Sequence, residues 1–237
     1  HRELSEIVPD MEAPVQAEQR NIAVVAVTAG DGIRTIFRDW QIEAFVDGGQ
    51  SMNPSTDDIL QAVKKAPSDN IIVLPNNKNI VLAAEQAAEL SEKNVFVLKT
   101  TSVPQGIAAA VAYDPEADLE ANVKRMGRVI KEVKTGLITH AVRDTRLNGN
   151  EIKKGDLIGI AENDIVANGT ELKTVFMELL RMMIDEDSEM ISIYYGEGAD
   201  EASAGQLEEL CGKEFSDRDI ELHYGGQPVY PYMIAVE

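Results

Sequence analysis

The sequence predicts an α/β protein made of two lobes: the first has a mainly parallel sheet flanked by helices, and the second has a mixed sheet with helices. Short β-branched runs alternate with helical stretches up to about residue 135, and the pattern changes after that point. Hydrophobic residues make up 44% of the 237 residues, which is enough for packed cores. We therefore expect one lobe over residues 21–135 and a second over residues 136–237.

Residues 1–20 are expected to form a linker from upstream domains of a longer protein. The stretch Val8–Gln19 contains two prolines and three acidic residues without apolar periodicity. The chain also begins with His1 rather than Met. Both observations favour a fragment that follows other domains.

The first lobe is predicted from four short apolar runs that are typical of strands buried on both faces. These runs are Asn21–Thr28, Gln41–Val46, Asn70–Leu74 and Asn94–Leu98. Helical patterns lie between them over Gly32–Asp39, Thr56–Ala66 and Ile80–Lys93, and a further amphipathic pattern covers Asp118–Val133. Alternation of this kind indicates parallel strands joined by right-handed crossovers.

The second lobe is predicted from an alternating segment, a hairpin signal and later helices. Leu137–Asp144 alternates, and Asn148–Gly149 is a strong hairpin turn signal. Further strands are expected at Asp156–Ala161, Asp164–Ala167, Met190–Tyr195, Glu221–Tyr224 and Tyr232–Val236, with helices at Glu171–Ile184 and Asp200–Glu214. Short hairpins and separated helices together indicate a mixed sheet.

The charge and the cysteine content exclude several classes of protein. The 41 acidic residues outnumber the 22 basic ones, so the formal net charge of −19 would repel nucleic acid and anionic lipid. The single cysteine, Cys211, excludes an internal disulfide and a zinc site built from cysteines. Apolar runs fall short of the ~18 residues of a membrane-spanning helix, and the cytoplasm is the expected compartment.

Polar loops follow each strand of the first lobe, at the edge where parallel strands commonly bind ligands. The last of these expected loops is Thr100–Gly106. The candidate cleft or ligand-binding residues in these loops are Thr28, Gly30, Gly49, Gln50, Asn53, Ser55, Thr56, Asn76, Asn77, Thr101, Ser102 and Gln105. The alternative is that these residue types only form tight turns.

The second lobe contributes His140, Arg143 and His223, which could line a cleft between the lobes, although strand histidines are often structural. A second Gly-Gly turn adds Gly225 and Gly226. The chain contains no GxxxxGK[ST], GxGxxG or GxSxG motif, so we assign no catalytic residue. The acidic run Asp185–Glu189 lacks the spacing of a calcium loop and is interpreted as a solvated face, so no metal site is expected.

Several of these loops resemble a known family. Gly48–Thr56 reads GGQSMNPST and is similar to the GGQTMNPST signature of the ATP-binding subunit of bacterial fatty acid kinase. That family fuses a dihydroxyacetone-kinase-like (DhaL-like) domain to a DegV-like region, and it is also called YloV-like or DAK phosphatase. Further matches are Leu74–Ile80, Thr100–Gly106, Tyr194–Gly196 and His223–Tyr232.

The resemblance implies that this chain is the non-catalytic C-terminal DegV-like region of such a kinase component. It implies that ATP and magnesium bind in the missing N-terminal domain, and that this region has no cofactor. It also implies that the region docks a DegV-type fatty-acid-binding protein, whose acyl carboxylate the upstream domain phosphorylates. The full-length parent is expected to be a homodimer.

Two other functions stay open at this point. The cleft between the lobes could bind a fatty acid or another small molecule, and the weakest alternative is an enzyme such as a phosphatase. DegV-type binders hold the carboxylate with TSQPS-like and HxGPG-like loops, for which Ser55, Thr101, Ser102 and His223 are candidates here. Gly226–Gln227 replaces Pro-Gly in the second loop, so Gln227 could fill the space of the carboxylate.

Overall fold

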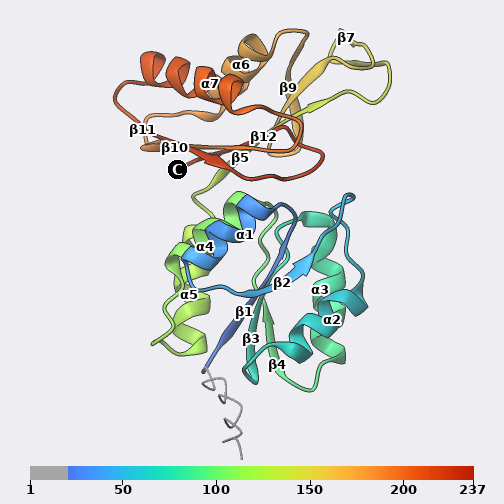
Figure 1. Cartoon of the computed structure of the whole chain (residues 1–237), viewed down its shortest axis with the longest axis vertical. Coiled ribbons are helices and arrows are strands. Elements are labelled where there is room, and N and C mark those ends of the chain that lie inside the picture. Colours follow the sequence, from blue (N-terminus) through green and yellow to red (C-terminus); the bar gives the residue numbers. More distant parts are fainter. Residues whose placement is uncertain (1–20) are drawn as a thin grey trace, which may run out of the picture.

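The computed structural model describes residues 21–237, which form two sheets stacked along the long axis of the molecule (Figure 1). The predicted linker over residues 1–20 lies outside the described residues. We call the part from β1 to α5 the first lobe and the part from β5 to β12 the second lobe. The first sheet is parallel and the second is mixed, as the sequence predicts.

The first sheet has the strand order β2-β1-β3-β4. Its strands are β1 (Ala23–Thr28), β2 (Ala44–Asp47), β3 (Asn70–Leu74) and β4 (Asn94–Val97). All three pairings are parallel, with Val25 opposite Ala44, Ala23 opposite Ile71 and Asn70 opposite Asn94. The strand C-terminal ends therefore meet at one edge, which faces the second lobe (Figure 1).

Helices cover both faces of this sheet. Their bounds are α1 (Asp31–Asp39), α2 (Thr56–Lys65), the short 3₁₀ helix η1 (Lys78–Ile80), α3 (Val81–Leu90), α4 (Val103–Ala112) and α5 (Leu119–Val129). Ile59 of α2 and Ala84 of α3 pack on one face of the sheet, in the core that contains Val25. Ile33 of α1 and Met126 of α5 belong to the core on the other face.

The segment Thr100–Gly106, which the sequence predicts to be a loop, contains the start of a helix instead. The Ser102 hydroxyl accepts a hydrogen bond from the Gln105 N–H at 3.2 Å, and Pro104 lies in the first turn. A hydroxyl N-cap and an early proline both favour a helix start. The apolar residues Ile107, Ala109 and Ala110 of α4 are buried in the core, so tertiary packing stabilises the helix.

The second sheet has the order β11-β10-β12-β5-β8-β9, in which only β10 and β11 pair in parallel. Its strands are β5 (Lys134–His140), β8 (Leu157–Ala161), β9 (Asp164–Gly169), β10 (Met190–Tyr195), β11 (Asp219–Tyr224) and β12 (Tyr232–Val236). A separate hairpin, β6 (Thr145–Leu147) and β7 (Asn150–Ile152), turns at Asn148–Gly149, both with positive φ. The expected strand Leu137–Asp144 is shifted, because β5 begins at Lys134 and ends at His140.

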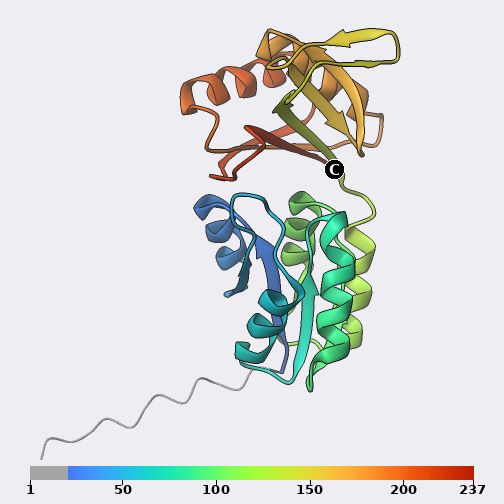
Figure 2. The same ribbon diagram turned by 90° about the vertical axis from the view of Figure 1, so that its right-hand side faces the viewer.

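Helices α6 (Leu172–Met183) and α7 (Glu201–Glu214) pack on the face of the second sheet that points away from the first lobe (Figure 2). The opposite face lies over α1 and α4 (Figure 1). Tyr194, Met233 and Ala235 of this face belong to the same buried cluster as Ile33 and Phe37 of α1. The two lobes therefore share a hydrophobic core, and their contact leaves two distinct hollows.

Candidate functional site

The first hollow lies where the strand ends of the first sheet meet the loop after β11, and we call it the loop-edge pocket. It has a volume of 270 Å³. Four of the predicted site residues line it, namely Gly30, Gly49, Gln50 and Gly226, together with Ala29, Asp31, Arg34, Asp47, Glu197, Tyr224 and Pro228. Sequence reasoning therefore brought together residues that are far apart in the chain, because parallel strands place their following loops side by side.

The backbone of the second lobe closes the helix end beside this pocket. The Ile33 N–H of α1 donates to the Gly225 carbonyl at 3.0 Å. A Cβ atom on Gly32 would lie 1.9 Å from the Tyr224 carbonyl oxygen, so only glycine permits this approach. Helix N-termini commonly bind anions through free N–H groups. Here carbonyl oxygens of the neighbouring lobe take the place that an anion would occupy.

Gln227 fills the interior of the same loop and is only 1% exposed. Its Nε2 donates to the Tyr194 carbonyl at 3.0 Å and to the Tyr230 carbonyl at 3.1 Å. Its Oε1, like the Thr28 hydroxyl, is buried without a hydrogen-bond partner. The Gln227 amide therefore fills this loop from within, and its place in the space of a ligand carboxylate stays a prediction.

Carboxylates outnumber cations in the lining of the loop-edge pocket. Asp47 accepts a hydrogen bond from the Gly49 N–H at 2.9 Å, and Arg34 Nη2 lies 3.2 Å from its carboxylate. The Gly49 N–H, followed by the Arg34 guanidinium, holds the pKa of Asp47 below its ordinary value. Asp31 and Glu197 add two more carboxylates to the lining, so the pocket does not attract a ligand carboxylate.

Asn76 forms internal hydrogen bonds that join three strand ends. Its Nδ2 donates to the Val27 carbonyl at 2.9 Å, and its Oδ1 accepts from the Thr100 hydroxyl at 2.8 Å. Its N–H donates to the same hydroxyl at 2.9 Å. Asn76 is 4% exposed, and these bonds give it a structural role.

Several other predicted site residues begin helices. Ser55 forms a capping box with Asp58 at the start of α2, and the Asn77 side chain accepts from the Asn79 N–H in η1.

Other predicted site residues form hydrogen bonds within or between the loops. Gln105 Oε1 accepts hydrogen bonds from both the N–H and the hydroxyl of Thr101. The Thr56 hydroxyl donates to Gln86 Oε1 at 3.1 Å, and Ser102 Oγ lies 2.7 Å from Thr135 Oγ1. Asn53 donates its N–H to the Gly48 carbonyl within the loop. Turn and cap formation thus accounts for these residue types.

The structure does not bring His140, Arg143 and His223 together. His140 Nδ1 lies 3.1 Å from the Gly155 carbonyl oxygen, and Arg143 is exposed beyond the end of β5. His223 lies on β11, where its Nε2 is 2.9 Å from Glu221 Oε2 and its ring stacks on Tyr194 at 5.3 Å. Of the three, His223 alone lines the second hollow between the lobes.

That second hollow, which we call the interlobe cavity, has a volume of 710 Å³. Residues of α1, α4 and α5 of the first lobe and of β10, β11 and β12 of the second line it. Its lining residues are Ile36, Trp40, Pro104, Ile107, Ala108, Val111, Ala112, Arg125, Val129, Glu132, Met190, Ser192, Tyr194, Glu221, His223, Ala235 and Glu237. Its size is within the range of ligand-binding cavities.

Sequence reasoning missed this cavity except for His223. Trp40 and Val111 line it and are 44% and 49% exposed, but this exposure is a property of the folded structure and not a signal in the sequence. Alternate residues of β10 and β11 also place Ser192, Tyr194 and Glu221 on the face that points toward the first lobe. Glu237 lies at one end, where burial, followed by Glu221 and Glu132, raises the pKa of its carboxyl.

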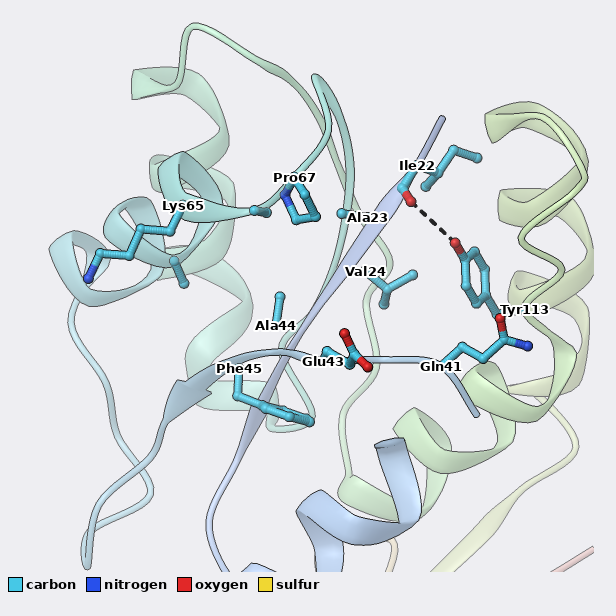
Figure 3. Close-up of a pocket in the computed structure, with 12 residues that line it drawn as sticks. Ile22, Ala23, Val24, Gln41, Glu43, Ala44, Phe45, Lys65, Pro67 and Tyr113 are labelled. Carbon is cyan, nitrogen blue, oxygen red and sulfur yellow. Dashed lines mark hydrogen bonds between the residues drawn. The ribbon is translucent and has the colours of Figure 1, made fainter. Parts of the chain in front are cut away.

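A further pocket of 390 Å³ lies at the opposite edge of the first sheet, beside the start of β1 (Figure 3). Its lining includes Glu43, Phe45 and Lys65, and the Tyr113 hydroxyl donates to the Ile22 carbonyl at 3.3 Å beside it. None of the predicted site residues lines this pocket.

Within residues 21–237, no three His, Cys, Asp or Glu side chains lie close enough to hold a metal ion. Burial raises the pKa of the free Cys211 thiol to about 12, so this thiol is unreactive at neutral pH. None of the helices in this described range is long and apolar enough to cross a membrane.

Comparison with protein families and curated sequences gives strong matches. The FakA-like C-terminal family of fatty acid kinase matches residues 23–237. Protein YloV of Bacillus subtilis is 40% identical over 228 residues, covering 96% of this chain and 41% of that protein. An uncharacterised protein of Staphylococcus haemolyticus is 41% identical over 224 residues, covering 94% and 41%. The chain therefore spans about two fifths of the length of these relatives.

Solved structures with the same fold include DegV proteins. A DegV family protein of Corynebacterium glutamicum superposes with a TM-score of 0.66 at 15% identity, over 92% of this chain and 97% of that one. The fatty acid kinase B3 protein of Streptococcus pneumoniae, solved with linoleic acid, gives 0.57 at 12% identity over 92% and 99%. Dihydroxyacetone kinase of C. freundii gives 0.59 at 13% identity over 92% and 48%. The DegV-like fold predicted from the sequence is confirmed.

Proposed function

Because the chain belongs to the FakA-like C-terminal family of fatty acid kinase, we propose that it docks a DegV-type fatty-acid-binding protein. Docking would hold the acyl carboxylate of that partner near a kinase domain elsewhere in the longer parent protein. Under this proposal ATP and magnesium bind outside residues 21–237, and the chain itself has no turnover. A homodimeric parent and a cytoplasmic location remain predictions.

The observation that carries the proposal is the closed loop edge. The chain has the fold of DegV proteins, yet carbonyl oxygens from Tyr224 and Gly225 approach the α1 N-terminus and Gln227 fills the neighbouring loop. A DegV-like fold whose α1 N-terminus is covered by backbone carbonyls, beside a pocket lined by three carboxylates, fits a docking module better than an acyl carrier.

A titration tests the proposal directly. Purified DegV-type proteins from the same organism, loaded with oleate, are titrated into the chain by isothermal calorimetry. We expect a one-to-one complex, with unchanged acyl content in the partner. If none of these partners binds, the docking proposal is wrong.

The interlobe cavity supports a second candidate, a fatty-acid or small-molecule binding module. Its apolar wall, formed by Ile107, Val111 and Val129 among others, is open enough for an acyl chain. This candidate predicts a bound lipid in mass spectra of the purified chain and a higher melting temperature with added oleate. Clean spectra and a flat melting response would contradict it.

A further inference from the structure

We propose that the interlobe cavity and the groove that continues from it bind a Lys- or Arg-bearing segment of the DegV-type partner with an apolar side chain at its tip. This inference rests on the proposed docking function and names the surface that performs it. Three features of the described residues lead to it: an exposed apolar mouth, a series of adjoining hollows, and a strong excess of carboxylates.

The apolar mouth is formed by side chains that the described chain covers only in part. Trp40 at the C-terminal end of α1 and Val111 of α4 are 44% and 49% exposed, and both line the cavity. Ile36 and Val129 continue the apolar wall inward. An apolar side chain inserted here would remove Trp40 and Val111 from water, at about 25 cal/mol per Å² of buried apolar surface. Aromatic residues in such pockets are frequent anchor points of interfaces.

The groove continues from the cavity along the second lobe. Glu132, Met190 and Glu237 line both the cavity and an adjoining hollow of 640 Å³. That hollow shares Asp187 and Glu189 with a third one of 510 Å³. The three hollows therefore adjoin one another, and we call them together the acidic groove; such a series of hollows suits a peptide segment better than a single small molecule.

Carboxylates dominate the charge of the groove. Its acidic residues are Glu132, Asp185, Glu186, Asp187, Glu189, Asp217, Asp219, Glu221 and Glu237, and its lysines and arginines are Arg125, Lys131, Lys134 and Arg218. Three of these four cations already form ion pairs. Arg125 pairs with Asp114 at 3.4 Å, Lys134 with Asp185, and Arg218 with Asp217 at 2.5 Å. The excess of carboxylates gives the groove a negative electrostatic potential, which attracts cationic groups and repels anionic ones.

This charge selects against a free fatty acid and in favour of a basic segment. Glu132 and Glu221 both raise the pKa of Glu237, so these carboxylates repel one another across the end of the cavity. A fatty acid carboxylate placed there would add to that repulsion. A lysine or arginine would relieve it, while the neighbouring apolar residue of the same segment enters the cavity.

Trp40 gives a local probe, because it is the single tryptophan of the chain. The chain is labelled with 5-fluorotryptophan, and its ¹⁹F resonance is followed during titration with an oleate-loaded DegV-type partner. We expect the resonance to shift in parallel with the complex formation measured by calorimetry. A complex that leaves the Trp40 resonance unmoved would overturn the inference. A shift produced by oleate alone, at the same affinity as in the presence of partner, would identify a lipid site and also overturn it.

A matched pair of charge reversals tests the groove. Glu132→Lys combined with Glu189→Lys changes two exposed groove residues, whereas Glu89→Lys combined with Glu92→Lys makes the same charge change at exposed positions at the end of α3 and just beyond it. We expect the groove variant to bind the partner at least about tenfold more weakly at low salt, and the control to stay within about twofold. Circular dichroism checks that both variants fold.

The outcomes separate the inference from the function on which it rests. If the unmodified chain binds no DegV-type partner, the docking function fails. If it binds, but both variants bind equally, docking stands and the assignment of this groove is wrong.

Discussion

The loop-edge pocket and the interlobe cavity lie at the same lobe contact but differ in what occupies them. At the loop edge, the Gly225 carbonyl accepts from the Ile33 N–H, and the Gln227 amide satisfies two further carbonyls. In the interlobe cavity, helices α1, α4 and α5 leave 710 Å³ unfilled beneath the second sheet. The glycine- and asparagine-rich motifs therefore allow the lobes to pack closely, whereas the open surface is lined by residues that no motif marks.

The largest expected effect is at the loop edge, where the backbones of the two lobes pack closely. Gly32→Ala would place a Cβ atom 1.9 Å from the Tyr224 carbonyl oxygen, and backbone atoms cannot move away without separating the lobes. We expect the free energy of unfolding to fall by about 3 kcal/mol in urea denaturation. Gly205→Ala in α7 is the control. Its Cβ meets no atom within 4 Å, so it should raise stability by up to about 1 kcal/mol.

Gln227→Ala removes the donor for the Tyr194 and Tyr230 carbonyls. Leaving these carbonyls without that donor should cost about 2 kcal/mol in thermal or urea unfolding. Gln50→Ala, at an exposed position of the same loop-edge pocket, should change stability by less than about 0.5 kcal/mol. Equal effects of the two substitutions would show that Gln227 does not close this edge.

Two neighbouring alanines of α4 test whether the interlobe cavity is open. Ala108 lines the cavity, whereas Ala109 is fully buried in the core. Ala109→Leu should cost about 2 kcal/mol through overpacking, and Ala108→Leu should leave the unfolding free energy within about 0.5 kcal/mol. A large loss of stability in Ala108→Leu would mean that the cavity has no room for a partner side chain.

The smallest expected effect concerns the pH dependence of stability at the end of the cavity. The pKa of Glu237 is raised above its ordinary value of 4.5, so the folded state holds the proton more tightly than the unfolded state. Its contribution to stability is therefore complete below about pH 4.5 and is lost as pH rises through the folded pKa. Glu237→Gln should raise the melting temperature at pH 7, and this gain should disappear below about pH 4.

Glu209 provides a control of opposite sign. Its carboxylate accepts from Lys213 Nζ at 2.7 Å, and this hydrogen bond lowers its pKa. Its contribution is present above the ordinary pKa and is lost as pH falls through the folded value. Glu209→Gln should therefore lower the melting temperature at pH 7. The same sign for both variants would contradict the assigned pKa shifts.

Much of the fold was predictable because its signals are local. β-branched runs identified the strands, and the helical pattern that begins at Thr56 identified α2, whose first turn has a Ser55–Asp58 capping box in the structure. Helix α4 was missed, because Thr101, Ser102 and Pro104 also suit a loop. The packing of Ile107 and Ala110 in the core stabilises the helix.

The candidate site was predictable only in part. Gly30, Gly49 and Gly226 do meet at one edge, since parallel strands direct their loops there. The interlobe cavity brings Ile36 together with Ser192, which lie 156 positions apart, and depends on how the lobes pack. Neither periodicity nor a motif reports such packing.

The central claim is that this region holds the partner rather than performing chemistry. The most direct measurement is acyl-phosphate formation by the full-length parent, with and without residues 21–237, as the concentration of oleate-loaded DegV-type partner is varied. The account predicts that deletion raises the apparent KM for the loaded partner by at least about tenfold, with a much smaller change in kcat. An unchanged KM after deletion would contradict it.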